Sequence, residues 1–142
     1  MLIGTILRVK GSRVTTVPPS ASVRAMLAQL AAHNIGAVVV STDGFTIEGI
    51  ASERDVVRHL NERGAGVLEE PVSAIMTTDV HTVGPGENVE ALRQIMTEQR
   101  FRHMPVVENG RLAGIVSIGD VVKSAIEELE TEKASLVDYL HR

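Results

Sequence analysis

A nine-residue stretch occurs twice in this sequence, first as Gly49-Ile50-Ala51-Ser52-Glu53-Arg54-Asp55-Val56-Val57 and again as Gly114-Ile115-Val116-Ser117-Ile118-Gly119-Asp120-Val121-Val122. A second match lies upstream, where Val14-Thr15-Thr16-Val17-Pro18-Pro19 returns 66 residues later as Val80-His81-Thr82-Val83-Gly84-Pro85. The offset falls to 65 in the later stretch, and a turn between strands can absorb such a loss. Self-similarity at a fixed spacing predicts two copies of one structural unit.

Each copy is expected to run strand, helix, strand, strand, helix. Ser22 and Asn88 are good N-cap residues, and the segments after them carry apolar side chains every three or four positions, as amphipathic helices do. Two β-rich runs follow each helix and are joined by Asp43-Gly44 in the first copy and by Asn109-Gly110 in the second. Such dipeptides favour the positive φ angles of a tight hairpin, so we expect one in each copy.

The second helices are expected to begin at Ser52 and Ser117, the first of them ending near Gly64. One such unit alone would expose its apolar helix faces, so we expect the two to pack about a pseudo-twofold axis with a groove between them. The predicted fold class is α+β, with two α/β-type β-α-β-β-α repeats and a C-terminal helix. The predicted segments are an N-terminal segment at 1–12, a first unit at 13–63, a linker at 64–77, a second unit at 78–125 and a C-terminal helix at 126–142.

The composition excludes several classes of protein. Of the 142 residues, 44% are hydrophobic and 23% charged, which is typical of a folded domain and not of a disordered chain. No apolar run approaches the roughly 18 residues of a membrane helix, and the apolar start at Met1 lacks the flanks of a secretory signal. A net charge of -4, 2% aromatic residues and no cysteine disfavour nucleic-acid binding and disulfides. We therefore expect a cytoplasmic protein with neither a membrane nor a nucleic-acid partner.

The repeated motif Gly-x-x-Ser-x-x-Asp supports two interpretations. In the structural one, Ser52 and Ser117 are hydroxyl N-caps and Asp55 and Asp120 complete capping-box variants that stabilise helices without a ligand. In the functional one, the helix N-terminus and the hydroxyl attract a phosphate while the carboxylate accepts both hydroxyls of a ribose. The spacing alone leaves both open.

Basic side chains that could bind a phosphate lie at the start of one predicted strand. Arg102 and His103 precede the second copy's strand where the first copy has Gly36 and Ala37. This asymmetry favours a ligand site, although a solvated strand end would also place basic residues there. Lys10 and Arg13 are weaker phosphate candidates, because short basic stretches are usually surface.

Sequence signals of catalysis are weak. The five histidines, at positions 33, 59, 81, 103 and 141, have no metal-ligand spacing, and no glycine-rich phosphate loop or nucleophile elbow occurs. We therefore expect no enzyme activity, no catalytic residues and no metal.

The C-terminal segment continues the second helix with a seam of three-four spacing: Val122, Ile126, Leu129, Lys133, Leu136 and Leu140. Glutamates occupy its outer positions, and Lys133 interrupts it. Docking against a partner subunit and a solvated terminal helix are the two interpretations.

With these features the chain resembles a tandem pair of CBS (cystathionine β-synthase) domains, a Bateman module, standing alone rather than attached to an enzyme. The resemblance runs from about Thr5 to Ile126. It rests on the two motif copies and on two further segments, Pro71-Val72-Ser73-Ala74-Ile75-Met76-Thr77 and Arg102-His103-Met104-Pro105-Val106-Val107.

This resemblance implies that an adenosyl ligand, such as AMP, ADP, ATP, NAD or S-adenosylmethionine, binds in clefts between the two domains. It implies that Asp55 and Asp120 hold the ribose and that four residues approach the phosphates: Ser52, Ser117, Arg102 and His103. Apolar side chains and backbone would hold the adenine at Ile35, Gly36, Ala37, Ile50, Met104, Pro105 and Ile115. Thr16, Thr82 and Arg54 complete the expected ligand-binding residues. Gly36 and Ala37 depart from the family's bulkier or basic residues, which leaves open whether one cleft holds a different ligand or none.

The implied function is a regulatory sensor that binds an adenosyl nucleotide and acts in trans on a partner protein. CBS pairs form twofold disks, so the resemblance also implies a homodimer whose geometry changes with occupancy. The alternative is a structural protein-protein interaction module with vestigial clefts.

Overall fold

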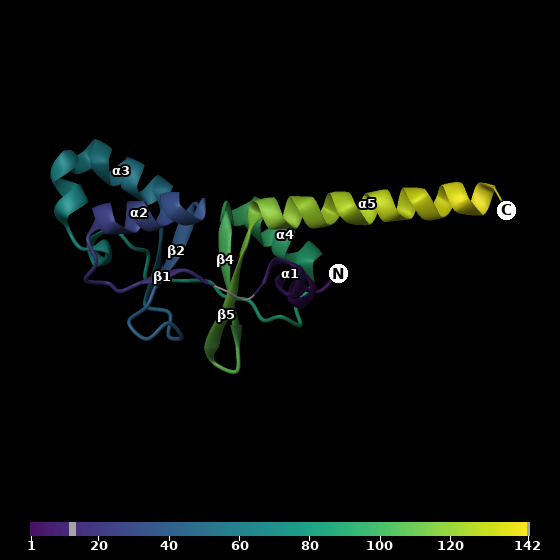
Figure 1. The fold of residues 1–142 in the computed structure, drawn as a ribbon, viewed down its shortest axis with the longest axis horizontal. Coiled ribbons are helices and arrows are strands. Elements are labelled where there is room, and N and C mark those ends of the chain that lie inside the picture. The colour runs from purple at the N-terminus through teal and green to yellow at the C-terminus, as the bar shows by residue number, and fades with distance from the viewer. Residues whose placement is uncertain (12–13, 142) are drawn as a thin grey trace.

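The computed structural model describes residues 1–11 and 14–141, and in it two similar units lie side by side with a long helix projecting from the second (Figure 1). The first unit contains β1 (Thr16–Val17), α2 (Val23–His33), β2 (Ala37–Val40), β3 (Gly49–Ser52) and α3 (Glu53–Arg63). The second contains α4 (Val89–Gln99), β4 (His103–Glu108), β5 (Arg111–Ser117) and α5 (Ile118–Leu140). The mixed fold of two repeats followed by a C-terminal helix is the predicted one.

The helices begin where the capping residues predicted. The Ser22 side chain accepts a hydrogen bond from Ala25 N, and that of Asn88 accepts one from Glu90 N. The second helices start after Ser52 and Ser117, each with a complete capping box. Each cap satisfies backbone N–H groups that a helix leaves without an internal partner.

The two predicted hairpins have different outcomes. In the second unit, Asn109 and Gly110 have φ angles of 54° and 75° and join β4 to β5 in the expected tight turn. In the first unit β2 and β3 also form an antiparallel hairpin, but the expected tight turn is wrong, because the long loop 41–48 connects the strands. Asp43 folds this loop by accepting hydrogen bonds from the backbone N–H groups of Phe45 and Thr46. An aspartate that caps a loop in this way removes the need for a two-residue turn.

The sheets differ in their first strand. In the first unit, β1 lies parallel to β2, which pairs with β3, giving the order β1-β2-β3. In the second unit, the expected first strand is reduced to a parallel bridge between Val83 and Val106, beside the two-stranded β4-β5 sheet. The predicted linker region holds two short 3₁₀ helices, Ala65–Glu69 and Val72–Ala74, whose Val67 and Val72 are buried in the first unit's core.

The N-terminal segment forms a helix, α1 (Ile3–Lys10), which the sequence did not lead us to expect. Its residues Ile3, Ile6 and Leu7 are buried with Leu92, Met104 and their neighbours in the core of the second unit. The chain thus starts in the second unit's core, builds the first unit and returns (Figure 1). Among the described residues, no helix is long and apolar enough to cross a membrane.

Candidate functional site

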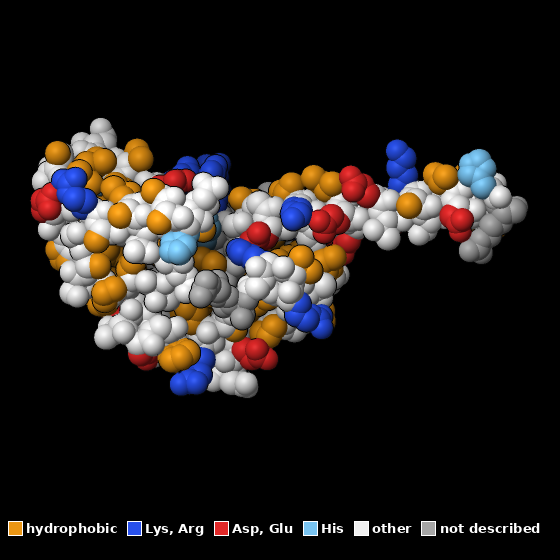
Figure 2. All heavy atoms as spheres, viewed as in Figure 1, with side chains coloured by type: hydrophobic (Ala, Val, Ile, Leu, Met, Phe, Trp, Pro, Cys, Tyr) orange, Lys and Arg blue, Asp and Glu red, His pale blue; other side chains and the backbone are white. Residues whose placement is uncertain are grey.

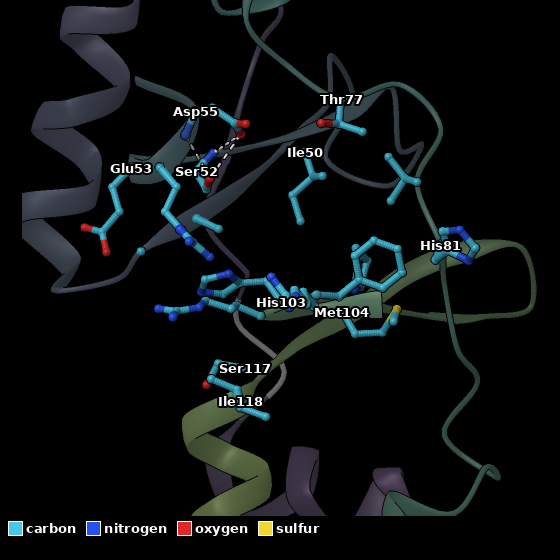
Figure 3. A pocket seen from close by; sticks show the side chains of 18 of the residues that line it. Ile50, Ser52, Glu53, Asp55, Thr77, His81, His103, Met104, Ser117 and Ile118 are labelled. Atoms are coloured by element: carbon cyan, nitrogen blue, oxygen red, sulfur yellow. Dashed lines mark hydrogen bonds between the residues drawn. The ribbon is translucent and has the colours of Figure 1, made fainter. Parts of the chain in front are cut away.

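A cleft of about 1150 Å³ lies between the two units and is lined by both. The N-terminal turn of α3 forms one wall and that of α5 the opposite one, with the start of β4 between them (Figure 3). A volume of this size suits a ligand as large as a nucleotide, because small-molecule sites typically enclose about 300–1,000 Å³.

The cleft gathers most of the residues proposed from the sequence. Those that line it are Gly36, Ala37, Ile50, Ser52, Arg54, Asp55, Arg102, His103, Met104, Pro105 and Ser117. Those outside its lining are Thr16, Ile35, Thr82, Ile115 and Asp120. Thr16 pairs with Val39 in the first sheet, whereas Ile115 and Asp120 contact Lys10 of α1.

The Asp55 carboxylate is held at the start of α3. Its Oδ2 accepts hydrogen bonds from Ser52 N at 2.8 Å and from Ser52 Oγ at 3.0 Å, and Arg58 donates to its Oδ1 at 2.8 Å. The N–H of Glu53 donates to Gly36 O, and that of Asp55 to Ser52 Oγ. The structural interpretation of the motif is therefore realised, and the helix N-terminus has few N–H groups left for a phosphate.

The corresponding carboxylate of the second copy, Asp120, faces α1. Its Oδ2 accepts hydrogen bonds from Ser117 N at 2.8 Å and from Lys10 Nζ at 2.7 Å, and the same ammonium donates to Ile115 O at 2.8 Å. Burial raises the pKa of the Asp120 carboxyl, but the Lys10 and Ser117 hydrogen bonds outweigh it and hold this pKa below its usual value. Lys10, a phosphate candidate from the sequence, is instead the ion-pair partner of Asp120, while Arg13 lies outside the described residues.

Cations surround the cleft that contains Asp55. Arg54 projects from α3 and Arg102 from the entry to β4, and both side chains are exposed. Sequence reasoning missed Arg100, which also lines the cleft and takes a left-handed backbone conformation with φ 59° at the end of α4. Within the described part of the chain, none of these three arginines has a salt bridge.

Several further lining residues were not proposed from the sequence, and His81 and Phe101 are two of them. The ring of His81 lies 4.9 Å, centroid to centroid, from that of Phe101 and tilts 40° against it. Both rings line the cleft, and His81 and Met104 are labelled in Figure 3. His81 lies in the repeated stretch 80–85 at a position where the first copy has Thr15, and Phe101 lies outside both repeated stretches, so the repeat did not single out either ring.

His103 lies where the two units meet. A Cβ atom at Gly36 would lie in ordinary van der Waals contact, at 3.5 Å, with both Cε1 and Nε2 of its ring, so this imidazole packs directly against the first unit. Burial and, after it, the charge of Lys10 lower the pKa of His103 below its usual value. His103, which replaces Ala37 of the first copy, therefore contributes packing between the two units.

The described residues contain no group of three or more histidines, aspartates or glutamates that could hold a metal ion. The cleft offers positively charged arginines, the carboxylates of Glu53, Asp55 and Asp79, of which that of Asp55 is held by hydrogen bonds, and a partly apolar floor. These features suit an organic anion that also carries hydroxyl groups.

Comparison with known proteins identifies the fold. The CBS domain family model matches residues 8–62 and 72–127, and the chain therefore belongs to the CBS domain family as a tandem pair. It is 46% identical to the CBS-domain containing protein ATU1752 from Agrobacterium tumefaciens, whose crystal structure superimposes with a TM-score of 0.85 over 88% of this chain and 99% of that one.

Two more distant similarities are informative. The chain is 38% identical over 112 residues to the CBS domain-containing protein CBSX3, mitochondrial, of Arabidopsis thaliana, covering 76% of this chain and only 54% of that protein. The CBS domain pair of protein MJ0100, solved in complex with 5′-methylthioadenosine and S-adenosyl-L-methionine, shares the fold with a TM-score of 0.79 at 23% identity, over 90% of this chain and 98% of that one.

Proposed function

We propose that this CBS pair is a regulatory module that binds an adenosyl nucleotide in the cleft containing Asp55. The observation that carries the proposal is that Arg54, Arg100 and Arg102, contributed by both units, border one cleft with a fixed carboxylate. The carboxylate suits a ribose and the guanidinium groups suit phosphates. The adenosyl ligands of the MJ0100 pair support the ligand class.

The candidate ligands remain AMP, ADP, ATP, NAD and S-adenosylmethionine. Within the described residues Arg54, Arg100 and Arg102 have no salt-bridge partner, which favours the ligands that carry phosphate, because an anionic group compensates clustered positive charge. Asp55 stands nearest the ribose in this proposal. No ligand is assigned to Asp120, because its carboxylate already accepts a hydrogen bond from Lys10.

Binding would regulate through the arrangement of the two units. A ligand that contacts α3 in the first unit and β4 in the second stabilises the arrangement in which those contacts are made. The module would then act in trans on a partner protein, without catalysis of its own. Occupancy would be read through the surface that the partner contacts.

Calorimetry and thermal shift with AMP, ADP, ATP, NAD and S-adenosylmethionine test the proposal. Asp55→Asn and Asp120→Asn form a matched pair, because each removes the same capping-box carboxylate from its own helix. We expect a phosphate-bearing ligand to stabilise the wild type, by about 2.7 kcal/mol at a hundredfold excess over Kd. Asp55→Asn should lose this stabilisation, and Asp120→Asn should keep it.

The structural alternative also has an observation in its favour, since both oxygens of Asp55 already accept hydrogen bonds within α3. If none of the five compounds stabilises the wild type at millimolar concentration, the cleft is vestigial and the chain acts as an interaction module. If both aspartate variants lost the ligand-induced stabilisation equally, the ligand would not bind specifically at Asp55.

A further inference from the structure

His103 places an imidazole in the middle of the cleft. It begins β4, where it pairs with Ser117, and it lies between the N-terminal turns of α3 and α5 (Figure 3). Its side chain is half-buried, yet in the described part of the chain neither ring nitrogen has a hydrogen bond or is sealed from solvent. An imidazole of this kind can gain or lose a proton when the charge around it changes.

The surroundings of the imidazole favour its neutral form. Burial is the largest effect and lowers the pKa of His103 below its usual value. The charges of Lys10 in α1 and of the adjacent Arg102 act in the same direction, whereas Glu53 of α3 and Asp120 of α5 act against them. We therefore expect the imidazole of the free cleft to be mostly neutral at pH 7.

The two carboxylates near the ring leave room for a further negative charge. The carboxylate of Asp120 accepts a hydrogen bond from Lys10 at 2.7 Å, so its charge is already compensated. Glu53 and His103 both flank Gly36, since a Cβ atom there would lie 3.2 Å from Glu53 Oε1 and 3.5 Å from His103 Nε2. Among the described residues, however, no carboxylate is bonded to the imidazole. Figure 2 shows Lys and Arg side chains gathered in the notch between the two units, where α5 begins.

We infer that a phosphate-bearing ligand enters this cleft together with a proton, which the imidazole of His103 takes up from the solvent. The inference rests on the proposed nucleotide site and adds a dependence on pH to it. A phosphate beside the ring favours imidazolium through its charge, and imidazolium donates from both ring nitrogens, whereas the neutral ring donates from one. His103 is then a further cation of the cleft only while the ligand is bound.

The coupling makes ligand affinity depend on pH. The bound phosphate raises the pKa of His103, so between the pKa of the free cleft and that of the occupied one only the occupied cleft holds the proton. Affinity therefore rises as the pH falls through this range and levels off below the pKa of the free cleft. The occupancy of the module would report acidification as well as ligand concentration.

Titration calorimetry with AMP, ADP, ATP and NAD counts the protons. The heat of binding is measured at pH 6.5 in PIPES and in imidazole buffer, and its dependence on the ionisation enthalpy of the buffer gives the protons taken up per ligand. His103→Gln is the matched variant, and subtracting its value removes any proton that the ligand itself exchanges. We expect the wild type to take up about half a proton more than His103→Gln, and its affinity to rise about fivefold more between pH 7.5 and 6.0. His81→Gln, which removes another histidine of the cleft lining, should keep the extra uptake.

NMR of the wild type follows the ring without any substitution. The titration midpoint of the His103 ring should move to higher pH when ADP is added to saturation. Lys10→Met should shift the pH of largest proton uptake upward, because it removes a charge that opposes the imidazolium.

The coupling and the nucleotide site can fail separately. If one of the four compounds binds and the wild type takes up no more protons than His103→Gln, the coupling is overturned although the site stands. Extra uptake that is lost in His81→Gln and kept in His103→Gln would assign the proton to His81 and equally overturn the inference. If none of the four binds at pH 7.5 or 6.0, the phosphate-bearing ligand of the proposed site is wrong, and the coupling is wrong with it.

Discussion

The ammonium of Lys10 lies 2.7 Å from Asp120 Oδ2 and joins the N-terminal helix to the second repeated motif. The equivalent carboxylate of the first copy, Asp55, is bonded instead by Arg58 of its own helix. Two motifs that are nearly identical in sequence therefore have different electrostatic surroundings. The difference arises because α1 has no counterpart over the first sheet.

The Lys10–Asp120 pair should contribute measurably to stability. In a double-mutant cycle with Lys10→Met and Asp120→Asn, we expect a coupling free energy of about 0.5–1 kcal/mol, because both side chains remain partly exposed to solvent. Urea denaturation at pH 7 measures the four unfolding free energies. A coupling indistinguishable from zero would mean that the pair is formed without stabilising the fold.

The same ion pair makes the stability of the fold depend on pH in the acid range. The pKa of Asp120 is lowered in the folded state, so its contribution to stability is complete above the unfolded-state pKa and is lost as the pH falls through the folded one. Lys10→Met removes the strongest cause of the lowering. We expect the carboxyl of Asp120 to titrate at higher pH in this variant when followed by NMR, and an unchanged titration would contradict the assignment.

His103 should make the protein less stable in weak acid. Its pKa is lowered in the folded state by burial and by Lys10, so the unfolded chain binds the proton more readily. Stability therefore falls as the pH drops below the ordinary histidine pKa of about 6.5. We expect His103→Gln to flatten the dependence of the unfolding free energy on pH between pH 7 and 5, and an unchanged slope would contradict the assignment.

The two motif glycines should differ in their tolerance of alanine. A Cβ at Gly49 would lie 2.9 Å from the carbonyl oxygen of Thr77, whereas one at Gly114 would meet the Leu7 side chain, at 2.6 Å. Backbone cannot move aside as a side chain can, so we expect Gly49→Ala to cost about 2–3 kcal/mol and Gly114→Ala about 1 kcal/mol. Gly66→Ala, with open space around it, is the control. If chemical denaturation showed a larger loss of stability for Gly114→Ala than for Gly49→Ala, the Leu7 side chain would be less able to move than the backbone at Thr77.

The loop 41–48 should depend on Asp43. Its hydrogen bonds to the backbone of Phe45 and Thr46, in that loop, lower the pKa of its carboxyl. We expect Asp43→Ala to accelerate amide exchange at Phe45 and Thr46, with Asp43→Asn intermediate because its amide oxygen still accepts. Exchange that is unaffected in both variants would mean that the loop is held by its other contacts.

Local rules predicted the helix starts well. Ser22, Ser52, Asn88 and Ser117 act on backbone groups two or three residues away, so their effect can be recognised within a short window of sequence. The same window was insufficient at Asp43-Gly44. There a carboxylate that can bond several backbone groups favoured a longer loop over a two-residue turn.

Long-range placements could not be predicted in this way. The apolar spacing of Ile3, Ile6 and Leu7 is compatible with a helix, but nothing local indicates that this helix completes the second unit's core. The cleft was found mainly through residues that belong to the repeat. Arg100 and Phe101 were missed because they lie in the connection before β4, whose path depends on how the units pack.

The start of the chain in the second unit's core has a topological consequence. The polypeptide passes between the units twice, once after Lys10 and once after Thr77. A protease that cut only after Thr77 would leave two fragments without a covalent bond between them, and the packing of α1 in the second unit's core would still hold the first unit to the second. Because two strands of chain span the boundary, rotation of one unit about a single swivel point is disfavoured, and small twisting or sliding displacements remain the accessible motions.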